Sequence, residues 1–290
     1  MYCSIFKPGL FDGKLVIVTG SGSGIGRCVA HELAALGATV ALVGRTPEKL
    51  VTVAAEIAES GGRARSYPGN IRDEDTVKAL VAQIVAEHGH VDGLVNNAGG
   101  QFPSLLRGIS KKGWEAVVQT NLTGGFLMAR ECLNQAMQRS GGAIVNIVAD
   151  MWGGMPGMGH SGAARAGMIN FTETAAFEWA GYGVRVNAVA PGYVASSGLD
   201  AYPPAMAELI RQAGKQCALQ RMATEAEISA AIVFLLSEAA SFITGAVLRV
   251  DGGRPNVRTG FPLEMQRKTA PFNGFHLARM PKVLAEREPE

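Results

Sequence analysis

The chain has 290 residues, of which 18% are charged and 47% are hydrophobic, and its formal net charge is +2. This near balance of charge argues against a nucleic-acid surface and against an acidic partner. No apolar run reaches the roughly 18 residues of a membrane span. Residues 1–11 lack the basic start and apolar core of a secretion signal, and the last residues are not a peroxisomal address. We therefore expect a cytoplasmic protein that binds neither nucleic acid nor membrane.

Seven short β-branched runs alternate with helical patterns of about ten to twenty residues. A run that is apolar throughout, such as residues 143–148, is typical of a strand buried on both faces in a parallel sheet. We predict one α/β domain over residues 1–253, with a short N-terminal arm, and a C-terminal extension over residues 254–290. Its core is expected to be a doubly wound, parallel, seven-stranded sheet (a Rossmann fold) with helices on both faces. The predicted strands are residues 15–19, 39–43, 63–67, 93–95, 143–148, 185–190 and 247–250.

The first strand leads into a glycine-rich stretch, residues 19–26, which reads Thr-Gly-Ser-Gly-Ser-Gly-Ile-Gly and precedes a helical pattern. Glycines at such a turn let the chain turn tightly and let a pyrophosphate approach, and the helix N-terminus carries about half a positive charge. Taken alone, the pattern also fits a glycine-rich turn without a ligand. The residues predicted to bind a dinucleotide here are Gly20, Ser21, Ser23, Gly24, Ile25 and Gly26.

The end of the second strand indicates which dinucleotide is bound. An NAD site places an acidic residue about twenty residues after the glycines, to hold the ribose 2′-hydroxyl. Gly44 and Arg45 stand there instead, so no carboxylate repels a 2′-phosphate and a guanidinium is available to bind it. We predict NADP(H), with a solvated arginine at a helix start as the alternative.

Two further segments follow strands on the same side of the predicted sheet. Asn70 and Ile71 are expected beside the adenine ring. Asn97, Ala98 and Gly99 are expected to line the cofactor groove. For either segment, ordinary turn chemistry is the alternative.

The order and spacing of four motifs resemble the short-chain dehydrogenase/reductase family over residues 12–253. These motifs are residues 19–26, Asn96 to Gly99, Asn121, and Pro191-Gly192. Within the family, residues 97–102, 121–124 and 160–167 resemble the peroxisomal trans-2-enoyl-CoA reductase branch, which is NADPH-dependent.

The resemblance implies roles for two of these motifs. Asn121 matches a family asparagine that supports a proton-relay water, although a side chain that binds helical backbone is the alternative. Pro191, Gly192 and Val194 match the loop that holds the nicotinamide carboxamide through backbone groups, and Ser196 keeps a hydroxyl where the family usually has threonine.

The catalytic Ser, Tyr and Lys of the family are all replaced in this chain. Their positions fall on Ala149, Ser161 and Arg165. Carbonyl reduction produces an alkoxide that needs an acid, and a serine hydroxyl is a poor one. Arg165 keeps the positive charge of the lysine but cannot relay protons, so it is expected to hold the nicotinamide ribose or an anionic oxygen.

Reduction of an enoyl thioester has different needs, because hydride addition to the β-carbon leaves an enolate on the thioester oxygen. Oriented donors stabilise such an oxygen, and Ser161 and Arg165 could supply them. The final proton could come from His160, Asp150, a bound water or Tyr193. His160 could equally be a helix-start residue satisfied by backbone, and Asp150 a solvated loop carboxylate or a helix cap.

These observations predict an NADPH-dependent enoyl-CoA reductase of fatty acid metabolism. Two alternatives stay open: a carbonyl reductase or alcohol dehydrogenase of the same family for a branched or terpenoid substrate, and a non-catalytic dinucleotide-binding protein. The resemblance also implies a homo-oligomer, a dimer or a tetramer, formed through the helices at residues 109–138 and 165–180. The four cysteines form no Cys-x-x-Cys pair, so we expect no metal site and no disulfides.

The C-terminal extension is rich in basic residues and phenylalanines, and it could cover the nucleotide of an acyl-CoA. A solvated tail and a packing arm between subunits are the alternatives. The residues concerned are Arg254, Arg258, Phe261, Arg267, Lys268, Phe272, Phe275, Arg279, Lys282 and Arg287.

Overall fold

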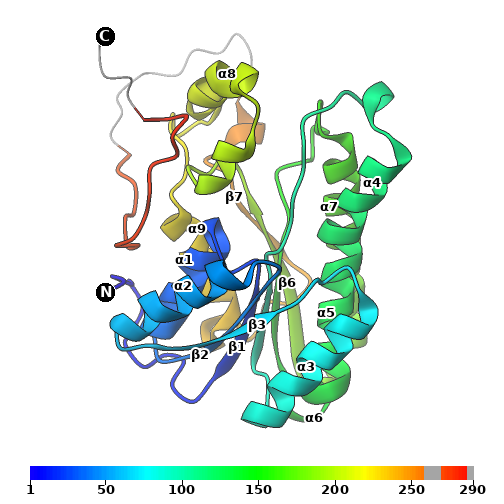
Figure 1. The fold of residues 1–290 in the computed structure, drawn as a ribbon, viewed down its shortest axis with the longest axis vertical. Helices are drawn as coiled ribbons and strands as arrows, with labels where there is room; N and C mark the ends of the chain where they lie inside the picture. Colours follow the sequence, from blue (N-terminus) through cyan, green and yellow to red (C-terminus); the bar gives the residue numbers. More distant parts are fainter. Residues whose placement is uncertain (258–268, 286–290) are drawn as a thin grey trace.

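A computed structural model describes residues 1–257 and 269–285 of the chain. Seven parallel strands form one sheet in the order β3-β2-β1-β4-β5-β6-β7 (Figure 1). The predicted fold class is therefore confirmed, and no predicted strand end is more than one residue from its place in the structure. The strands are β1 (Leu15–Thr19), β2 (Thr39–Gly44), β3 (Arg63–Pro68), β4 (Gly93–Asn96), β5 (Gly142–Ile147), β6 (Val184–Pro191) and β7 (Val247–Val250).

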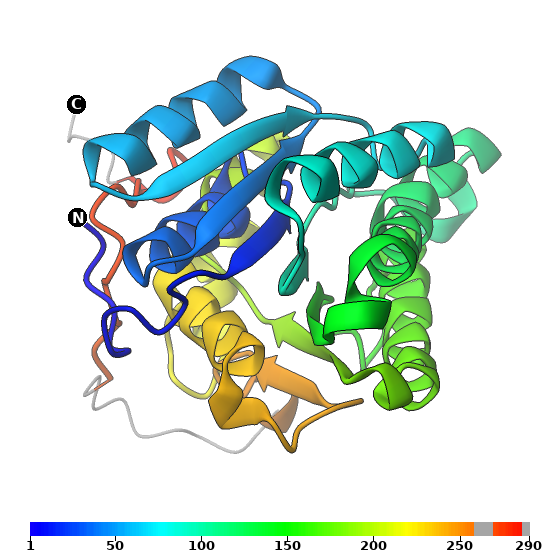
Figure 2. The same cartoon turned by 90° about the horizontal axis from the view of Figure 1, so that it is seen from below.

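Helices cover both faces of this sheet (Figures 1 and 2). Leu15 and Ile17 of β1 pack into the core beneath α3, α5 and α7, whereas Val16 and Val18 pack into the core beneath α1, α2 and α9. Because successive side chains of a strand face opposite layers, β1 is apolar throughout. The helices are α1 (Gly24–Ala35), α2 (Pro47–Glu59), α3 (Glu74–His88), α4 (Lys111–Val118), α5 (Gly124–Cys132), α6 (Gln138–Ser140), α7 (Gly159–Glu178), α8 (Ala207–Gln212) and α9 (Glu225–Leu236).

Two helical segments differ from the predicted pattern. One-turn π-helices over Gln119–Thr123 and Leu133–Met137 join α4, α5 and α6 into one long helical segment. Helix α7 begins at Gly159, six residues before the predicted start at residue 165. Its first turn contains Gly159 and Gly162, and glycine's low helix propensity hides such a start in the sequence.

The strand order reverses between β1 and β4. Strand β1 pairs with β2 on one side and with β4 on the other. The connections from these strands therefore leave toward opposite faces, and a crevice is expected at their carboxyl ends. Ligands of open α/β sheets bind at such a switch point.

The described part of the C-terminal extension lies against its own chain, beside the N-terminal arm (Figure 1). Phe275 is buried and stacks on Tyr2 at 5.9 Å between ring centroids. Arg27 of α1 donates to the Leu277 carbonyl, and Thr224 donates to the Phe272 carbonyl. Residues 269–285 thus pack within the subunit, an arrangement that none of the sequence-based alternatives included. Arg258, Phe261, Arg267, Lys268 and Arg287 lie outside the described residues.

Within residues 1–257 and 269–285, no helix is long and apolar enough to cross a membrane.

Candidate active site

The glycine turn and the segment after β4 are held together at the switch point. The Thr19 hydroxyl accepts hydrogen bonds from the backbone N–H groups of Asn97 and Ala98, each at 3.0 Å. The Asn97 amide donates to the carbonyls of Thr19 and Gly20 at 3.0 and 3.3 Å. A Cβ on Gly26 would overlap the Gly20 carbonyl and the Asn97 amide, so only glycine fits where the helix crosses the turn.

The N-terminus of α1 opens into free space. Ser23 is the N-cap, but its side chain makes no capping bond, and the first turn holds no acidic residue. Gly24 has a φ of +56°, and a Cβ placed on it would have no atom nearer than 3.9 Å, the nearest being Glu225 Oε1. By contrast, Asp73, Ser110 and Thr224 cap the helices α3, α4 and α9. The uncapped, positively charged end of α1 therefore fits the diphosphate of a dinucleotide.

The other turn residues have distinct positions. Ser21 is fully buried, and its hydroxyl donates to the Val43 carbonyl at 3.4 Å, so it ties the turn to the end of β2. Ser23 is exposed at the helix start, and Ile25 packs partly into the core beneath α1.

Arg45 follows the last residue of β2 and is exposed. It forms no hydrogen bond or ion pair with any residue in the described ranges. Its guanidinium is therefore available to an anion at this end of the crevice.

Of the two residues predicted beside the adenine ring, Asn70 is exposed and Ile71 is buried. Asn70 is exposed and its Oδ1 accepts from the Arg72 N–H at 3.3 Å, which is ordinary turn chemistry. Ile71 is buried at 6% exposure, against Gly124 at the start of α5. Only Asn70 thus presents its side chain to solvent.

The Pro191-Gly192 loop is fixed by the strand next to it. The Gly192 N–H donates to the Val250 carbonyl at 3.0 Å, and Val194 bridges to Ala223. Ser196 lies across the crevice from α1, with its Oγ 4.0 Å from a Cβ placed on Gly24. The glycine turn and this loop therefore lie close to each other at the switch point, with Ser196 next to the start of α1.

Arg165 and Asn121 meet at the loop after β4. Nη1 of Arg165 donates to the Ile147 carbonyl, and burial lowers the pKa of this arginine to about 10. A Cβ on Gly99 would lie 2.6 Å from both Arg165 Nη2 and Asn121 Oδ1. Asn121 binds the backbone of Gly100 with both ends of its amide, at 3.1 and 2.6 Å. The side chain of Asn121 therefore holds this loop in place. The alternative to a water-relay role was a side chain bonded to helical backbone; Asn121 is bonded to backbone, but to that of the loop after β4.

Ser161 is fully buried one turn before Arg165 on α7. Its hydroxyl donates to Gln101 Oε1 at 2.7 Å, and Gln101 Nε2 donates to the Tyr202 hydroxyl at 2.7 Å. The hydroxyl hydrogen that was expected to face substrate is thus directed at Gln101.

His160 is also fully buried, and its ring edge meets Phe102 at 4.4 Å between centroids. Nδ1 accepts a bond from the Ser161 N–H at 2.9 Å, while Nε2 has no partner among the described residues. The backbone contact agrees with the helix-start interpretation of this residue.

Asp150 forms an ion pair with Arg254, which opens the C-terminal extension, at 2.6 Å. The Arg254 guanidinium also lies 4.9 Å over the Tyr193 ring. The Tyr193 hydroxyl donates to Gln216 at 3.2 Å. Asp150 and Tyr193, two of the proposed proton donors, therefore have partners of their own.

Sequence reasoning missed Gln101, Tyr202, Arg254 as a partner of Asp150, and Glu225. The Tyr202-Pro203-Pro204 run indicates only a loop, and no local pattern links it to α7. Glu225 lies in the first turn of α9. Acidic residues are common at helix starts, so its sequence position does not distinguish it from an ordinary helix-start residue.

Glu225 faces the α1 end of the crevice and is 7% exposed. Burial raises the pKa of its carboxyl to about 7, although the charge of Arg27 opposes this shift. The folded state therefore favours the protonated acid, and the unfolded chain loses that proton first as the pH rises above about 4.5.

We expect the free energy of unfolding of the unliganded protein to fall by about 3 kcal/mol between pH 4.5 and pH 7.5 on account of Glu225. Glu225→Gln should flatten this decline in melts recorded at several pH values. A partial slope should remain, because burial also raises the pKa of Glu32. The exposed Glu238→Gln is the control, and equal slopes in both variants would contradict the assignment.

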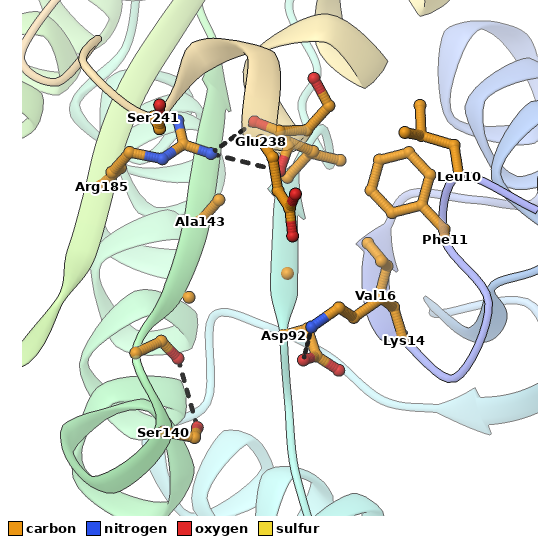
Figure 3. Close-up of a pocket in the computed structure, with 15 residues that line it drawn as sticks. Leu10, Phe11, Lys14, Val16, Asp92, Ser140, Ala143, Arg185, Glu238 and Ser241 are labelled. Carbon is orange, nitrogen blue, oxygen red and sulfur yellow. Dashed lines mark hydrogen bonds and ion pairs between the residues drawn. The ribbon is translucent and has the colours of Figure 1, made fainter. Parts of the chain in front are cut away.

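A cavity of about 210 Å³ lies at the opposite edge of the sheet, where β1, β4 and β5 begin (Figure 3). Lys14 and Asp92 pair there at 3.1 Å. Arg185 donates to the carbonyls of Leu235, Leu236 and Ser237 at the end of α9. These bonds satisfy Arg185 as a cap on the C-terminus of α9, which is a structural role. None of the lining residues belongs to the glycine turn or to the Pro191-Gly192 loop, so the cavity is separate from the predicted cofactor site.

Comparisons with known proteins cover most of the chain. A family model described as enoyl-(acyl carrier protein) reductase matches residues 20–254. The 3-oxoacyl-(acyl-carrier-protein) reductase FabG of Staphylococcus aureus is 37% identical over 83% of this chain and 97% of its own length. The "Probable 2,4-dienoyl-CoA reductase" of Bacillus subtilis is 35% identical over 84% of this chain and 97% of its own length. The solved structure of citronellol catabolism dehydrogenase (AtuB) from Pseudomonas aeruginosa PAO1 has a TM-score of 0.79 and 58% identity, covering 87% of this chain and 99% of that chain.

The matched region contains the glycine turn, the Asn-Ala-Gly segment and the Pro-Gly loop. The narrower resemblance to the peroxisomal enoyl-CoA reductase branch stays a prediction. With its sheet order, crevice and relatives taken together, the chain belongs to the short-chain dehydrogenase/reductase family of oxidoreductases, which bind a nicotinamide dinucleotide.

Proposed function

We propose that this oxidoreductase uses NADPH to reduce the carbon-carbon double bond of trans-2-enoyl-CoA thioesters. The observation that carries the proposal is the pair Ser161 and Arg165 on one face of α7, where the family has a proton-donating Tyr and Lys. Arg165 keeps a fixed positive charge beside Gly99 but has no proton to give at neutral pH. Such a site suits an enolate, which needs donors, better than an alkoxide, which needs an acid.

The residues of the chain have separable tasks in this reaction. Bound NADPH supplies the hydride that adds to the β-carbon. Arg165, held by the Ile147 carbonyl, directs Nη2 toward Gly99, where it can hold the nicotinamide ribose or the substrate oxygen. Asn121 fixes the backbone of Gly100 and so keeps this wall of the site in place. The relative named as a 2,4-dienoyl-CoA reductase supports a conjugated thioester as the substrate class.

The preference for NADPH rests on Arg45. In the Arg45→Ala variant we expect NADPH to bind about 10- to 100-fold more weakly, because a charge-assisted bond to a phosphate contributes about 1.5–3 kcal/mol. Affinity for NADH should not change. Fluorescence titration of both cofactors measures this, with the exposed Arg139→Ala as control. Equal affinity of the unmodified protein for NADH and NADPH would contradict the assignment.

The second candidate function is oxidation or reduction at an alcohol or carbonyl of a branched terpenoid. Its support is the 58% identity to a dehydrogenase of citronellol catabolism. FabG, named for a 3-oxoacyl substrate, also acts at a carbonyl. A reaction of this kind needs a proton donor other than Ser161.

One assay separates these functions. The purified protein is mixed with NADPH and either crotonyl- to decenoyl-CoA or a panel of ketones and aldehydes, and with NADP⁺ and citronellol. We expect loss of nicotinamide absorbance with the enoyl thioesters and little with the carbonyls. Turnover of carbonyls or citronellol with enoyl-CoA untouched would establish the second candidate, and no turnover on any substrate would favour a binding protein.

We further propose that the chain forms a homo-oligomer through the long segment α4 to α6 and α7. Phe177 on α7 is 86% exposed and Trp114 on α4 is 38% exposed, so this face offers apolar surface to a second copy. Light scattering of the purified protein measures the oligomeric state directly.

A further inference from the structure

Three side chains from three separate segments form one hydrogen-bonded chain at the site. Ser161 lies on α7, Gln101 follows β4 by five residues, and Tyr202 lies between β6 and α8. Ser161 Oγ donates to Gln101 Oε1, and Gln101 Nε2 donates to Tyr202 Oη, both at 2.7 Å. The chain therefore runs in one direction, from the buried serine to the tyrosine.

This direction decides which hydroxyl can donate to a ligand. The hydrogen of Ser161 is committed to Gln101, and the serine is fully buried. Tyr202 accepts a bond at its oxygen, and its own hydrogen is donated to Met158 Sδ, 3.9 Å away. A thioether sulfur is a weak acceptor, so an anionic oxygen of a ligand would take this hydrogen in its place. A hydroxyl that already accepts a hydrogen bond is polarised into a better donor.

Gln101 connects the Tyr202 hydroxyl to the residues proposed for the reaction. Ser161 and Arg165 are four residues apart on α7 and so share one face. Gln101 directly follows Gly100, whose backbone is bound at both ends by Asn121. Tyr202 is half-buried over this corner.

The C-terminal extension anchors the segment that carries Tyr202. The Lys282 N–H donates to Asp200 Oδ1 at 2.8 Å, two residues before the tyrosine. Arg211 of α8 donates to the Val283 carbonyl at 3.0 Å. The packed extension thus fixes both ends of the segment from residue 200 to α8.

We propose that Tyr202 is a catalytic residue whose hydroxyl holds the carbonyl oxygen of the substrate, and that Gln101 and Ser161 are positioning residues that orient it. This inference rests on the proposed enoyl-thioester function and deepens it. Hydride from NADPH bonds to the β-carbon, and the π electrons of the double bond move to form an enolate on the thioester oxygen. Tyr202 donates a hydrogen bond to that oxygen without losing its proton. A water molecule then gives a proton to the α-carbon and leaves as hydroxide, the carbonyl re-forms, and NADP⁺ remains as the oxidised product.

The test removes only the hydroxyl. Tyr202→Phe should lower kcat for crotonyl-CoA about 100-fold, since one oriented donor at an oxyanion typically contributes that much. The Kd of NADPH should not change. Ser161→Ala and Gln101→Ala should have smaller effects on kcat, about 10-fold, because each acts through Tyr202. The matched control is Tyr182→Phe, since Tyr182 is 44% exposed and its hydroxyl bonds to no residue in the described ranges.

Two further measurements distinguish a loss of the Tyr202 hydrogen bond from a general loss of active-site structure. With deuteride on the transferred position of NADPH, the isotope effect on kcat should increase in Tyr202→Phe, because hydride transfer becomes rate-limiting. Combining Tyr202→Phe with Gln101→Ala should add little to the single Tyr202→Phe loss, because both changes act on the same donor.

A binding measurement keeps this inference distinct from the proposed function. Saturated butyryl-CoA is titrated into the NADP⁺-loaded protein, and Tyr202→Phe should weaken its binding several-fold. Wild-type turnover of enoyl-CoA with an unchanged kcat in Tyr202→Phe would overturn the role of Tyr202 and leave the function standing. A larger loss in Ser161→Ala than in Tyr202→Phe would also overturn it, because the serine would then be the donor. If no enoyl-CoA is reduced by the wild type, the function fails, whereas a weaker butyryl-CoA affinity in Tyr202→Phe still supports Tyr202 as the oxygen-binding group.

Discussion

Replacing Arg165 by alanine is expected to lower kcat/KM for enoyl-CoA by about 100- to 1,000-fold. Its Nη1 is fixed by the Ile147 carbonyl, so Nη2 is presented toward Gly99 in one orientation. A donor fixed before the reaction begins costs no reorganisation when charge develops, and its loss typically removes about 3–4 kcal/mol of transition-state stabilisation. Steady-state kinetics at saturating NADPH measure the effect.

The lysine variant separates charge from shape. Arg165→Lys keeps a cation but loses the planar fork, so we expect it to retain more activity than Arg165→Ala and less than the wild type. Burial lowers the pKa of Arg165 to about 10, and the ordinary pKa of lysine is already about two units below that of arginine. The cation is lost as pH rises through the pKa, so Arg165→Lys should lose activity at a lower pH than the wild type. The exposed Arg139→Ala is the control, and equal activity of Arg165→Ala and wild type would show that this position has no role.

The strands and the cofactor-binding loops could be predicted because their signals are local. Strand β1 alternates its apolar side chains between two helix layers, which the sequence shows as an unbroken apolar run. The glycine turn shows its function in four glycines within seven residues, and Gly26 is the point where the turn meets the loop after β4. Each of these signals depends on residues next to one another in the chain.

The hydrogen-bond partners at the site could not be predicted, because they come from distant segments. Ser161 was expected to donate to substrate, but its partner Gln101 lies 60 residues away, and Tyr202 lies 101 residues beyond Gln101. Asp150 and Arg254 are separated by 104 residues. A hydroxyl or carboxylate has many potential partners, and only the packed topology selects one of them.

The position of the C-terminal extension was hidden for a related reason. Its hydrogen bonds with α1 and α9 are made largely through backbone groups, such as the carbonyls of Phe272 and Leu277. Every residue type carries a carbonyl, so such contacts leave no pattern in the sequence. The basic residues are the visible pattern of the extension, whereas the packed contact is made by Phe275 against Tyr2 and Arg27.

Replacing Gly24 by valine is expected to weaken NADPH binding more than 100-fold while the protein stays folded. The nearest atoms to a Cβ at this position, from Glu225 and Ser196, are 3.9–4.0 Å away, so the side chain meets no wall of the protein. It would instead occupy the open space at the N-terminus of α1, where the uncapped N–H groups can bind a diphosphate. Titration with NADPH and thermal melts of the same samples measure both quantities.

The folding cost of this change comes from the backbone, since the φ of Gly24 is +56°, and it is about 1–3 kcal/mol. Gly61 offers a matched control, because its φ is +80° and a Cβ there would meet nothing within 4 Å. Gly61→Val carries a similar backbone strain in the turn before β3, away from the crevice. If the strain alone mattered, the two variants would lose stability and NADPH affinity together. If both variants melt at equally lowered temperatures and only Gly24→Val loses NADPH affinity, the loss of affinity is due to the side chain in the space at the N-terminus of α1. If folded Gly24→Val binds NADPH normally, the diphosphate lies elsewhere.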